Sequence, residues 1–499
     1  MDLHVSLSAR GDLSGEIYRQ IRCAILERRI RAGDRLPSSR DLARTLRVAR
    51  MTVVVAYERL AGDGFLVTRV GAGTFVSEQL IRSPSLAARS GRARTQSRSV
   101  EQREPVGPVA RGRDSTHGRS PRVRSVWDAI PLPSVFARPA RYDFRSGVPD
   151  LTRFPHRAWR RAMGRALDAD VTSAGTYADP AGHHGLRVAI ARHIGAARGV
   201  RATVDDVVVT GGTQQALDLV ARVLLEPGDR VAVEDPGYVM PRRLLASLGV
   251  RVSGVPVDGE GVVVESLPND ARLVYVTPSH QYPTGVSMSL ARRVELLEWA
   301  ARRDAIVIED DYDTEFRFDG RPADSLQSLD RNGRVIYVGS FSKTLLPTLR
   351  VGFLVAPAPL RAALVKARFV SDWHGALPVQ SAIARFIEDG EFARHLRRMR
   401  RVYAVRRDVI VDTLSRTFEG ELRVVPSVAG LHIAAVAPQA SVERMADVAR
   451  RAADLDVAVQ ALGSFAHDVP STPGLVLGYG AIAEDRIGEG LRRLRQCLV

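Results

Sequence analysis

The spacing of apolar residues near the start of the chain predicts two short helices. The first is amphipathic, because four apolar residues recur at helical spacing: Leu13, Ile17, Ile21 and Ile25. A second helix is predicted to follow Pro37 and to run to about Leu46, with Ser38 and Asp41 at capping-box spacing.

A third helix and a hairpin are predicted directly after these. The third helix ends at Gly64 and has one apolar face, made of Val53, Ala56, Tyr57 and Leu60. Because only residues 47–49 separate the second and third helices, the pair has the helix–turn–helix arrangement. Two β-rich segments, 65–68 and 74–76, surround the glycine loop 69–73 and predict a hairpin that serves as a wing.

From about residue 142 to the end, short β-branched runs alternate with longer amphipathic stretches. This alternation is typical of a parallel sheet covered by helices. The predicted strands are 207–209, 231–233, 273–276, 305–308 and 335–338.

Between these two parts, residues 78–140 are rich in Arg, Ser, Pro and Gly and poor in apolar residues. Such a composition buries too little apolar surface to offset the entropy of ordering, so we expect a disordered linker. Its charge has two interpretations, a nonspecific attraction to DNA or a solubilising tether, and the composition leaves both open.

A chain of 499 residues exceeds the size at which one core stops growing, so at least two domains are expected. The fold class is therefore multidomain α+β and α/β. We expect a winged helix–turn–helix at residues 11–77, a linker at 78–140, and a domain with a mostly parallel sheet at 141–499.

Charge and cysteine content narrow the class of protein. A net charge of +16 and a pI near 10.6 favour a polyanionic partner. Two cysteines support neither a disulfide framework nor a metal cluster, so we expect no metal and a reducing cytoplasm. The sequence has no signal-peptide pattern and no apolar run long enough for a membrane span, so we expect no membrane contact.

The segments that follow the predicted strands contain the candidate chemistry, because sheets of this class bind ligands beyond the carboxyl ends of their strands. Residues 210–215 offer glycine backbone at a helix start, which suits a phosphate. The other segments, 234–238, 277–285, 309–313 and 339–343, add an aromatic ring, a carboxylate, a phenol and an amine. Together they meet the needs of pyridoxal 5′-phosphate.

One lysine stands out in a chain that otherwise uses arginine. Of 72 basic residues only Lys343 and Lys366 are lysines. Lysine forms a Schiff base with an aldehyde and arginine does not, so we expect Lys343 to be the cofactor anchor. Lys366, within a helical pattern, is interpreted as an ordinary surface cation.

The N-terminal unit resembles the GntR family of winged-helix repressors over about residues 11–77. The resemblance is carried by residues 32–40, 50–52, 57–60 and 64–65. It implies contacts with a double-stranded DNA operator through Ser38, Arg40, Arg50, Thr52, Arg69 and Gly71. Val54 stands where some relatives present a basic residue, so base preference does not transfer. The alternative is a winged helix that makes only protein contacts.

The C-terminal unit resembles fold-type I aminotransferases, and its pairing with the head resembles the MocR (GabR-like) regulators. Asp310, Tyr312 and Arg350 fall in that family's order around Lys343. The resemblance implies that Asp310 pairs with the pyridine nitrogen and that Tyr312 bonds the ring oxygen. It also implies that Tyr238 stacks on the ring and that the phosphate is held by Thr213, Gln214, Ser340, Ser342 and Arg350.

Two departures from the enzyme pattern bear on turnover. Tyr282 replaces the asparagine that usually precedes Pro-Thr-Gly, with His280 as a candidate substitute in the cofactor site. The strand around residues 476–480 lacks the arginine that clamps a substrate carboxylate. Arg141, Arg145 and Arg153 are either carboxylate partners or solvated surface residues. We expect at most partial or slow transamination.

These observations predict a transcription regulator that uses a cofactor-binding domain to sense pyridoxal phosphate itself or an amine or amino-acid effector. The resemblance also implies a head-to-tail homodimer, with each head over the partner's domain. One alternative is a working aminotransferase whose head localises it or is idle. Another is a DNA-binding scaffold whose large domain is empty.

Overall fold

The computed structural model describes residues 12–27, 29–69, 73–77, 123–128, 130–131, 140–174, 177–318 and 324–498, together with Val5 and Leu7. Most of the predicted linker lies outside these residues. Inside it, Ser125–Trp127 forms the short helix η2, and Arg124 donates a hydrogen bond to the carbonyl oxygen of Ser247 at 2.8 Å.

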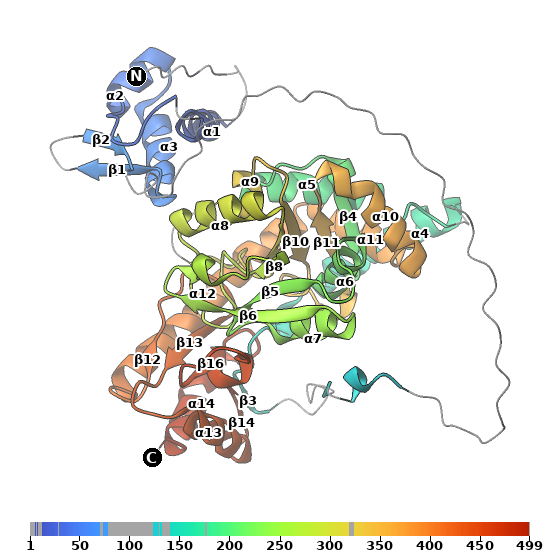
Figure 1. Ribbon diagram of the computed structural model, residues 1–499, viewed down its shortest axis with the longest axis vertical. Helices are drawn as coiled ribbons and strands as arrows, with labels where there is room; N and C mark the ends of the chain where they lie inside the picture. Colours follow the sequence, from blue (N-terminus) through green and yellow to red (C-terminus); the bar gives the residue numbers. More distant parts are fainter. Residues whose placement is uncertain are drawn as a thin grey trace.

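The head is a three-helix unit with a two-stranded hairpin (Figure 1). Its elements are α1 (Leu13–Leu26), α2 (Ser39–Leu46), α3 (Arg50–Gly62), β1 (Leu66–Arg69) and β2 (Gly73–Val76). The apolar faces predicted for α1 and α3 form its core, with Ile17, Ile21, Val53 and Leu60 fully buried. The winged helix–turn–helix prediction is confirmed in its elements and their order.

Two local predictions in the head differ from the structure. Helix α3 ends at Gly62, and Gly64, at a φ of +78°, forms the turn into β1. Ser38 caps α2 by accepting a hydrogen bond from the Asp41 amide at 3.2 Å. Only this half of the capping box forms, because the Asp41 carboxylate accepts from the Ser38 hydroxyl at 2.6 Å.

The large domain is built on an eight-stranded sheet in the order β4-β11-β10-β9-β8-β5-β6-β7. Strands β10, β9, β8, β5 and β6 run parallel, while β11 and β7 are antiparallel to their neighbours. The bounds are β4 Val207–Thr210, β5 Arg230–Asp235, β6 Arg251–Asp258, β7 Gly261–Val262, β8 Ala271–Val276, β9 Ile306–Asp311, β10 Val335–Ser340 and β11 Gly352–Val355. All five predicted strands are confirmed, and β4, β5, β9 and β10 each end in polar residues.

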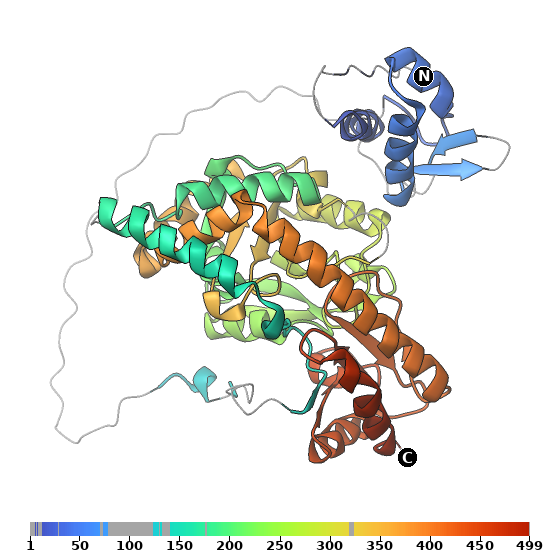
Figure 2. The same ribbon diagram turned by 180° about the vertical axis from the view of Figure 1, so that it is seen from behind.

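Helices cover both faces of this sheet (Figures 1 and 2). They are α4 His156–Ala174, α5 His184–Arg198, α6 Thr213–Leu224, α7 Val239–Ser247, α8 Leu290–Arg303, α9 Leu326–Leu329, α10 Ala358–Asp372 and α11 Leu377–Glu388. Short helical turns are η4 Leu151–Arg153, η5 Val204–Asp206, η6 Val264–Ser266 and η7 Pro347–Leu349. Alternate residues of β8 face opposite layers: Tyr275 packs in one apolar cluster, and Val274 and Val276 pack in another.

A smaller lobe lies at the C-terminal end of the chain. It comprises α12 Glu391–Thr417, β12 Arg423–Val424, β13 His432–Val436, α13 Val442–Asp454, β15 Gln460–Ala461, η8 Leu462–Phe465, β16 Gly474–Gly478 and α14 Glu484–Gln496. Strand β3 (Tyr142–Asp143), from the start of the large unit, pairs in parallel with β14 (Val457–Ala458). None of the helices within the described ranges combines the length and the apolar character that crossing a membrane requires.

Candidate functional site

Lys343 follows β10 and lies in a polar site at the carboxyl end of the sheet. Its Nζ donates a hydrogen bond to the carbonyl oxygen of Gly147 at 2.7 Å. Burial lowers the pKa of Lys343, while the carboxylates of Asp313 and Asp310 act in the opposite direction. An amine with a lowered pKa is more often neutral, which is the form that attacks an aldehyde. No motif or spacing in the sequence had marked Gly147 as part of this site.

Asp310, on β9, is buried, and only one of its two carboxylate oxygens has a hydrogen-bond partner. Its Oδ2 accepts a hydrogen bond from the hydroxyl of Tyr275 at 2.6 Å, whereas its Oδ1 has no hydrogen-bond partner. Burial raises the pKa of Asp310 to about 7. A buried acceptor without a donor fits the protonated ring nitrogen of pyridoxal phosphate. Tyr275, which orients this carboxyl, was missed because it reads as an ordinary residue of a buried strand.

The predicted phosphate residues converge around the start of α6. Thr213 is the first residue of that helix, and Gly212 before it has a φ of +103°. The guanidinium of Arg350 packs against Gly212, where a Cβ would lie 3.1 Å from Arg350 Nη2. Ser340 donates a hydrogen bond to the Ser342 hydroxyl at 3.0 Å. A helix N-terminus with a nearby guanidinium is a favourable place for a phosphate group.

Two residues near this loop have roles that differ from or extend the prediction. Gln214 points its amide toward the carbonyl oxygen of Met240, at 3.5 Å. Gln215, which sequence reasoning did not assign, accepts hydrogen bonds from the Gly211 amide at 2.6 Å and from buried Arg368. It therefore braces the glycine turn from behind, and only the tertiary contact with α10 identifies it.

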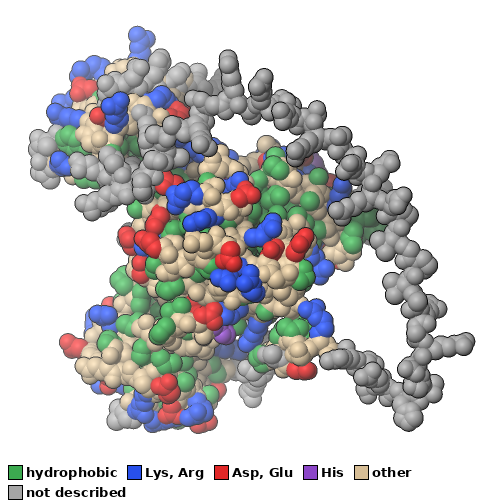
Figure 3. All heavy atoms as spheres, viewed as in Figure 1, with side chains coloured by type: hydrophobic (Ala, Val, Ile, Leu, Met, Phe, Trp, Pro, Cys, Tyr) green, Lys and Arg blue, Asp and Glu red, His purple; other side chains and the backbone are tan. Residues whose placement is uncertain are grey.

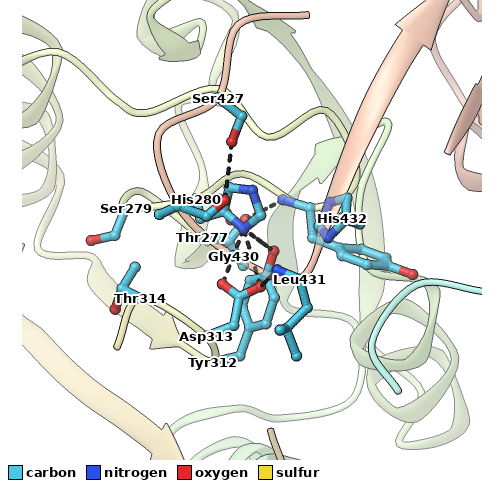
Figure 4. Close-up of polar contacts among 12 residues, drawn as sticks. Thr277, Ser279, His280, Tyr312, Asp313, Thr314, Ser427, Gly430, Leu431 and His432 are labelled. Carbon is cyan, nitrogen blue, oxygen red and sulfur yellow. Dashed lines mark hydrogen bonds and ion pairs between the residues drawn. The ribbon is translucent and has the colours of Figure 1, made fainter. Parts of the chain in front are cut away.

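Tyr312 and His280 form a hydrogen-bonded group with Asp313 (Figure 4). The Tyr312 hydroxyl donates to the His280 carbonyl oxygen at 2.9 Å and lies 3.1 Å from its Nδ1. That Nδ1 is also 3.0 Å from an Asp313 carboxylate oxygen, and the imidazole is buried. The structure thus directs His280 Nδ1 to Asp313 and Tyr312, and Tyr312 directly follows β9.

His432 completes this cluster from the small lobe. The ligand atoms of His280, Asp313 and His432 lie within 4.8 Å of one another, a spacing that a metal ion can use. His432 Nε2 is, however, 3.1 Å from the Pro283 carbonyl oxygen, and His280 Nδ1 is engaged as described. Burial lowers the pKa of His432 well below its usual value, which keeps this imidazole neutral. Hydrogen bonds account for the arrangement of the cluster.

An aromatic and apolar wall lies beside Tyr238 and Tyr282. Their rings meet edge to face at 5.7 Å, and Tyr282 meets Phe465 in the same way at 5.3 Å. Tyr282 also packs on the apolar cluster that contains Val476, in the strand where the enzymes carry their clamping arginine. The Tyr282 hydroxyl lies 2.7 Å from that of Ser146. This wall offers no cation to a ligand carboxylate.

The three early arginines are each engaged with a protein group. Arg145 is held by Asp143 through two hydrogen bonds of 2.9 and 2.6 Å. Arg153 lies 3.5 Å from an Asp150 carboxylate oxygen, and Arg141 lies over the Tyr142 ring. Within the described part of the chain, Arg145 and Arg153 are thus paired with protein carboxylates and Arg141 is engaged with a ring.

The candidate nucleic-acid interface is the outer end of the head. Ser38, Arg40 and Arg50 are exposed, and Thr52 is half-buried in the first turn of α3. The Tyr57 hydroxyl donates to the Pro37 carbonyl oxygen at 2.9 Å, which fixes α3 against the start of α2. Arg69 packs over the Phe75 ring at 5.3 Å in the wing. Gly71 lies outside the described residues. Figure 3 shows basic side chains at the top of the head.

Comparisons with known proteins match both parts of the chain. Residues 13–76 match the family described as bacterial regulatory proteins of the gntR family. Residues 142–471 match the family described as aminotransferase class I and II.

Two curated relatives are similar over nearly the whole length. A probable rhizopine catabolism regulatory protein, MocR, of Rhizobium meliloti is 34% identical over 97% of this chain and 93% of its own. An HTH-type pyridoxine biosynthesis transcriptional regulator, PdxR, of Corynebacterium glutamicum is 32% identical over 97% of this chain and 96% of its own.

Solved structures are similar to the large unit. The kynurenine aminotransferase of Pyrococcus horikoshii, crystallised in complex with PMP, superposes with a TM-score of 0.67 at 29% identity. The match covers 76% of this chain and 94% of that enzyme. The similarity to regulators therefore spans both units, whereas the similarity to this enzyme spans the large one.

Proposed function

This chain belongs to the MocR-type transcription regulators, in which a GntR-family head precedes a class I and II aminotransferase domain, and we propose that it senses its ligand through bound pyridoxal phosphate. The similarities make the chain a DNA-binding regulator. The proposal concerns the cofactor that it binds and the effector that it senses. The observation that carries the proposal is the unpartnered buried Oδ1 of Asp310 in the site that contains Lys343.

Each part of the cofactor has a candidate partner in this site. Lys343 supplies the amine that would hold the aldehyde carbon, and Asp310 the acceptor for the ring nitrogen. Arg350, the start of α6, Ser340 and Ser342 would hold the phosphate. When bound, pyridoxal phosphate supplies an aldehyde that exchanges between primary amines and a ring that withdraws electrons. Tyr238 and Tyr312 would orient the ring, and His280 would act through Tyr312.

We propose that the effector is an amine or amino acid, or pyridoxal phosphate itself. The wall around Tyr282 and Val476 provides no cation, and Arg145 is already paired with Asp143. An effector without an α-carboxylate therefore fits this site better than an α-amino acid does. The same feature supports at most partial or slow transamination, because turnover requires the substrate to be held in one orientation.

For DNA binding we propose the exposed N-terminal turn of α3, with Arg50 and Thr52, together with Ser38, Arg40 and the wing around Arg69 and Gly71.

We also propose a homodimer. Its support is an exposed apolar surface formed by Tyr177, Phe369, Val370 and Trp373, where Val370 is 81% exposed and the Tyr177 and Trp373 rings stack at 4.2 Å. Apolar surface of this kind marks protein contacts.

The test is a gel shift on the DNA upstream of the protein's own gene, at one fixed salt concentration and with competitor DNA. We expect a specific complex whose apparent Kd changes when pyridoxal phosphate is added. Lys343→Arg should keep the complex and lose the change, because arginine cannot form the covalent bond. Lys366→Arg, at the other lysine, is the matched control. A cofactor response that persists in Lys343→Arg contradicts the proposal.

A working aminotransferase is the second candidate, favoured by the retention of Lys343, Asp310 and Arg350 in one site. It predicts multiple turnovers between an amino acid and a 2-oxo acid at roughly 1–1000 per second. Turnover at such rates, together with no specific DNA complex, would replace the regulator as the main function.

A further inference from the structure

The head contacts the large domain through one buried carboxylate. Asp324 lies directly before Ser325, the N-cap of α9, and its side chain is only 6% exposed. Three head residues surround it, Tyr18 and Arg22 from α1 and Arg59 from α3. Arg22 Nε lies 3.0 Å and Arg59 Nη2 3.6 Å from its oxygens, and the Tyr18 hydroxyl donates to it.

The head side of this contact is a compact group. The Arg59 guanidinium lies 3.9 Å from the centre of the Tyr18 ring, and Arg22 donates to the Ser328 carbonyl oxygen at 3.0 Å. The Tyr18 hydroxyl is also 2.8 Å from Asp63, whose pKa is raised to about 6 by burial and by the Asp324 charge. Two guanidinium groups and a phenol of the head thus bind the Asp324 carboxylate. Each of these groups would lose a buried partner if the head moved away.

The large-domain side of the contact is braced by β9. Successive residues of a strand face opposite sides of the sheet, so the neighbours of Asp310 point away from the cofactor site. Glu309 accepts hydrogen bonds from the amides of Leu326 and Gln327, both at 2.9 Å. Asp311 holds Arg198 Nε at 2.6 Å, and the Arg198 carbonyl oxygen accepts from the Ser325 amide at 3.3 Å.

Of the two carboxylates that flank Asp310, Glu309 therefore holds the segment after Asp324 directly, and Asp311 is linked to it through Arg198. A displacement of β9 at Asp310 must move Glu309 and Asp311, and with them residues 325–327. Figure 1 and Figure 2 both place the head over the α8–α9 end of the large domain.

Apolar residues of the head and of the large domain also form one continuous cluster across this interface. A cavity of about 590 Å³ lies beside the contact, lined by Asp63 and Phe65 of the head and by Ser279 and Arg293 of the large domain. Hydrogen bonds and ion pairs are directional and apolar contacts are not, so the polar cluster around Asp324 is the part of the interface that fixes one orientation. Arg50 lies at the opposite end of α3 from Arg59, roughly 13 Å away at 1.5 Å per residue, so the docked head keeps its DNA-facing turn exposed.

We propose that Asp324 is the docking residue for the winged-helix head, and that β9 transmits changes at the cofactor site to this contact. The docking part stands on the contacts alone, and the transmission part rests on the proposed function. In the structure of the single chain the head lies against its own large domain. A head-to-tail dimer would use the same two surfaces between chains, because exchange of an element between protomers preserves its interface.

Docking is tested in the full chain by pulsed electron spin distance measurement. One label is placed on Cys23, exposed on α1, and the other on Arg302→Cys of α8, with Cys497→Ala to remove the remaining thiol. We expect one narrow distance distribution. Asp324→Arg should broaden it, and combination with Arg59→Asp should narrow it again, because the ion pair returns with its charges exchanged.

Asp324→Asn removes only the charge and is less disruptive to folding than Asp324→Arg, so it serves as the second test variant. Asp270→Asn, on the surface, is the matched control. An unchanged distribution in both Asp324 variants would overturn the docking role. Dilution with unlabelled chain distinguishes docking within a chain from exchange between chains, and either result agrees with the assigned surfaces.

Transmission is tested by the ratio of DNA affinities with and without pyridoxal phosphate. In Asp324→Asn this ratio should fall to about 1, with specific DNA binding retained. A ratio equal to that of the wild type, with docking lost, would overturn transmission and leave the proposed function intact. A wild-type ratio of about 1 would instead count against the proposed function, and the distance measurements would still decide docking.

Discussion

At the scale of the residue, burial gives Asp310 and Lys343 properties that neither has in water. The Asp310 carboxyl has a pKa raised to about 7, and the Lys343 amine has a lowered pKa. Both shifts come mainly from the loss of solvent, which disfavours a charge of either sign. A bound pyridinium ring would remove the penalty on Asp310 by supplying the missing partner for Oδ1.

Asp310→Asn should weaken binding of pyridoxal phosphate about 10- to 100-fold, because hydrogen bonds to charged groups contribute about 1.5–3 kcal/mol. The amide cannot compensate the charge of a protonated ring nitrogen. Absorbance titration of the cofactor-free protein measures the change. Tyr275→Phe, which only removes the hydroxyl that orients Asp310, should have a smaller effect. Equal affinity of Asp310→Asn and wild type would exclude the pairing.

The same residue predicts a pH dependence in the cofactor-free protein. The folded-state pKa of Asp310 is raised, so its contribution to stability is fully present below pH of about 4 and is lost as pH rises toward 7. Asp310→Asn removes this loss. Its Tm relative to wild type should therefore be higher at pH 8 than at pH 5, by roughly 2–5 °C.

Calorimetry or circular dichroism at the two pH values measures this difference. Asp270→Asn, a change of an exposed carboxylate, should shift Tm equally at both. The pKa of Glu234, also raised to about 7, is partly raised by the Asp310 charge, so Asp310→Asn lowers it and changes the Tm difference in the same direction. A difference that is constant with pH in Asp310→Asn would show that the carboxyl is not the group that titrates.

At the scale of the element, α3 has two ends with different tasks. Its N-terminal turn carries Arg50 in an exposed position, and its C-terminal half carries Arg59 toward Asp324. Val53, Ala56, Tyr57 and Leu60 on one face bury the helix between these ends. The helix therefore connects the proposed DNA-facing turn rigidly to the proposed docking contact.

Arg50→Ala should weaken specific DNA binding by about 1–3 kcal/mol, the usual value of a base contact made by arginine. If Arg50 instead contacts only phosphate, the affinity should fall for all sequences alike and the salt dependence should become shallower. Fluorescence anisotropy at several salt concentrations separates the two. Arg302→Ala on α8 is the matched control, and equal affinities of both variants would remove Arg50 from the interface.

At the scale of the whole molecule, the chain presents surfaces of two chemical kinds. The head carries exposed arginines, and the sequence as a whole has a net charge of +16. The large domain carries the apolar surface of Tyr177, Phe369, Val370 and Trp373. The first kind suits a polyanion, and the second suits another protein surface from which water is excluded.

Val370→Asp should convert a dimer into monomers, because a carboxylate buried in an apolar contact loses its hydration without gaining a partner. Light scattering after size exclusion measures the mass. Val67→Asp, at an exposed apolar position of the wing, is the control and should leave the mass unchanged. If Val370→Asp keeps the mass of the wild type, this surface is not the dimer contact.

The sequence alone was sufficient for the elements and for the choice of a candidate anchor. Apolar periodicity predicted α1 and α3, capping-box spacing predicted α2, and short β-branched runs predicted the five strands, because each of these signals is local in the sequence. A single lysine after a strand in an arginine-rich chain predicted the role of Lys343, because that inference needs only the chemistry of an amine. The segment after a predicted strand contained Asp310, and the resemblance to the family added Arg350.

Only the tertiary structure decided how these residues are supported. Tyr275 meets Asp310, Gly147 meets Lys343, and Gln215 meets Arg368 across long stretches of sequence. The three basic and phenolic groups around Asp324 come from helices that precede it by more than 250 residues. Side chains brought together by packing of separate elements leave no local pattern, so no periodicity or motif marks them before the chain is folded.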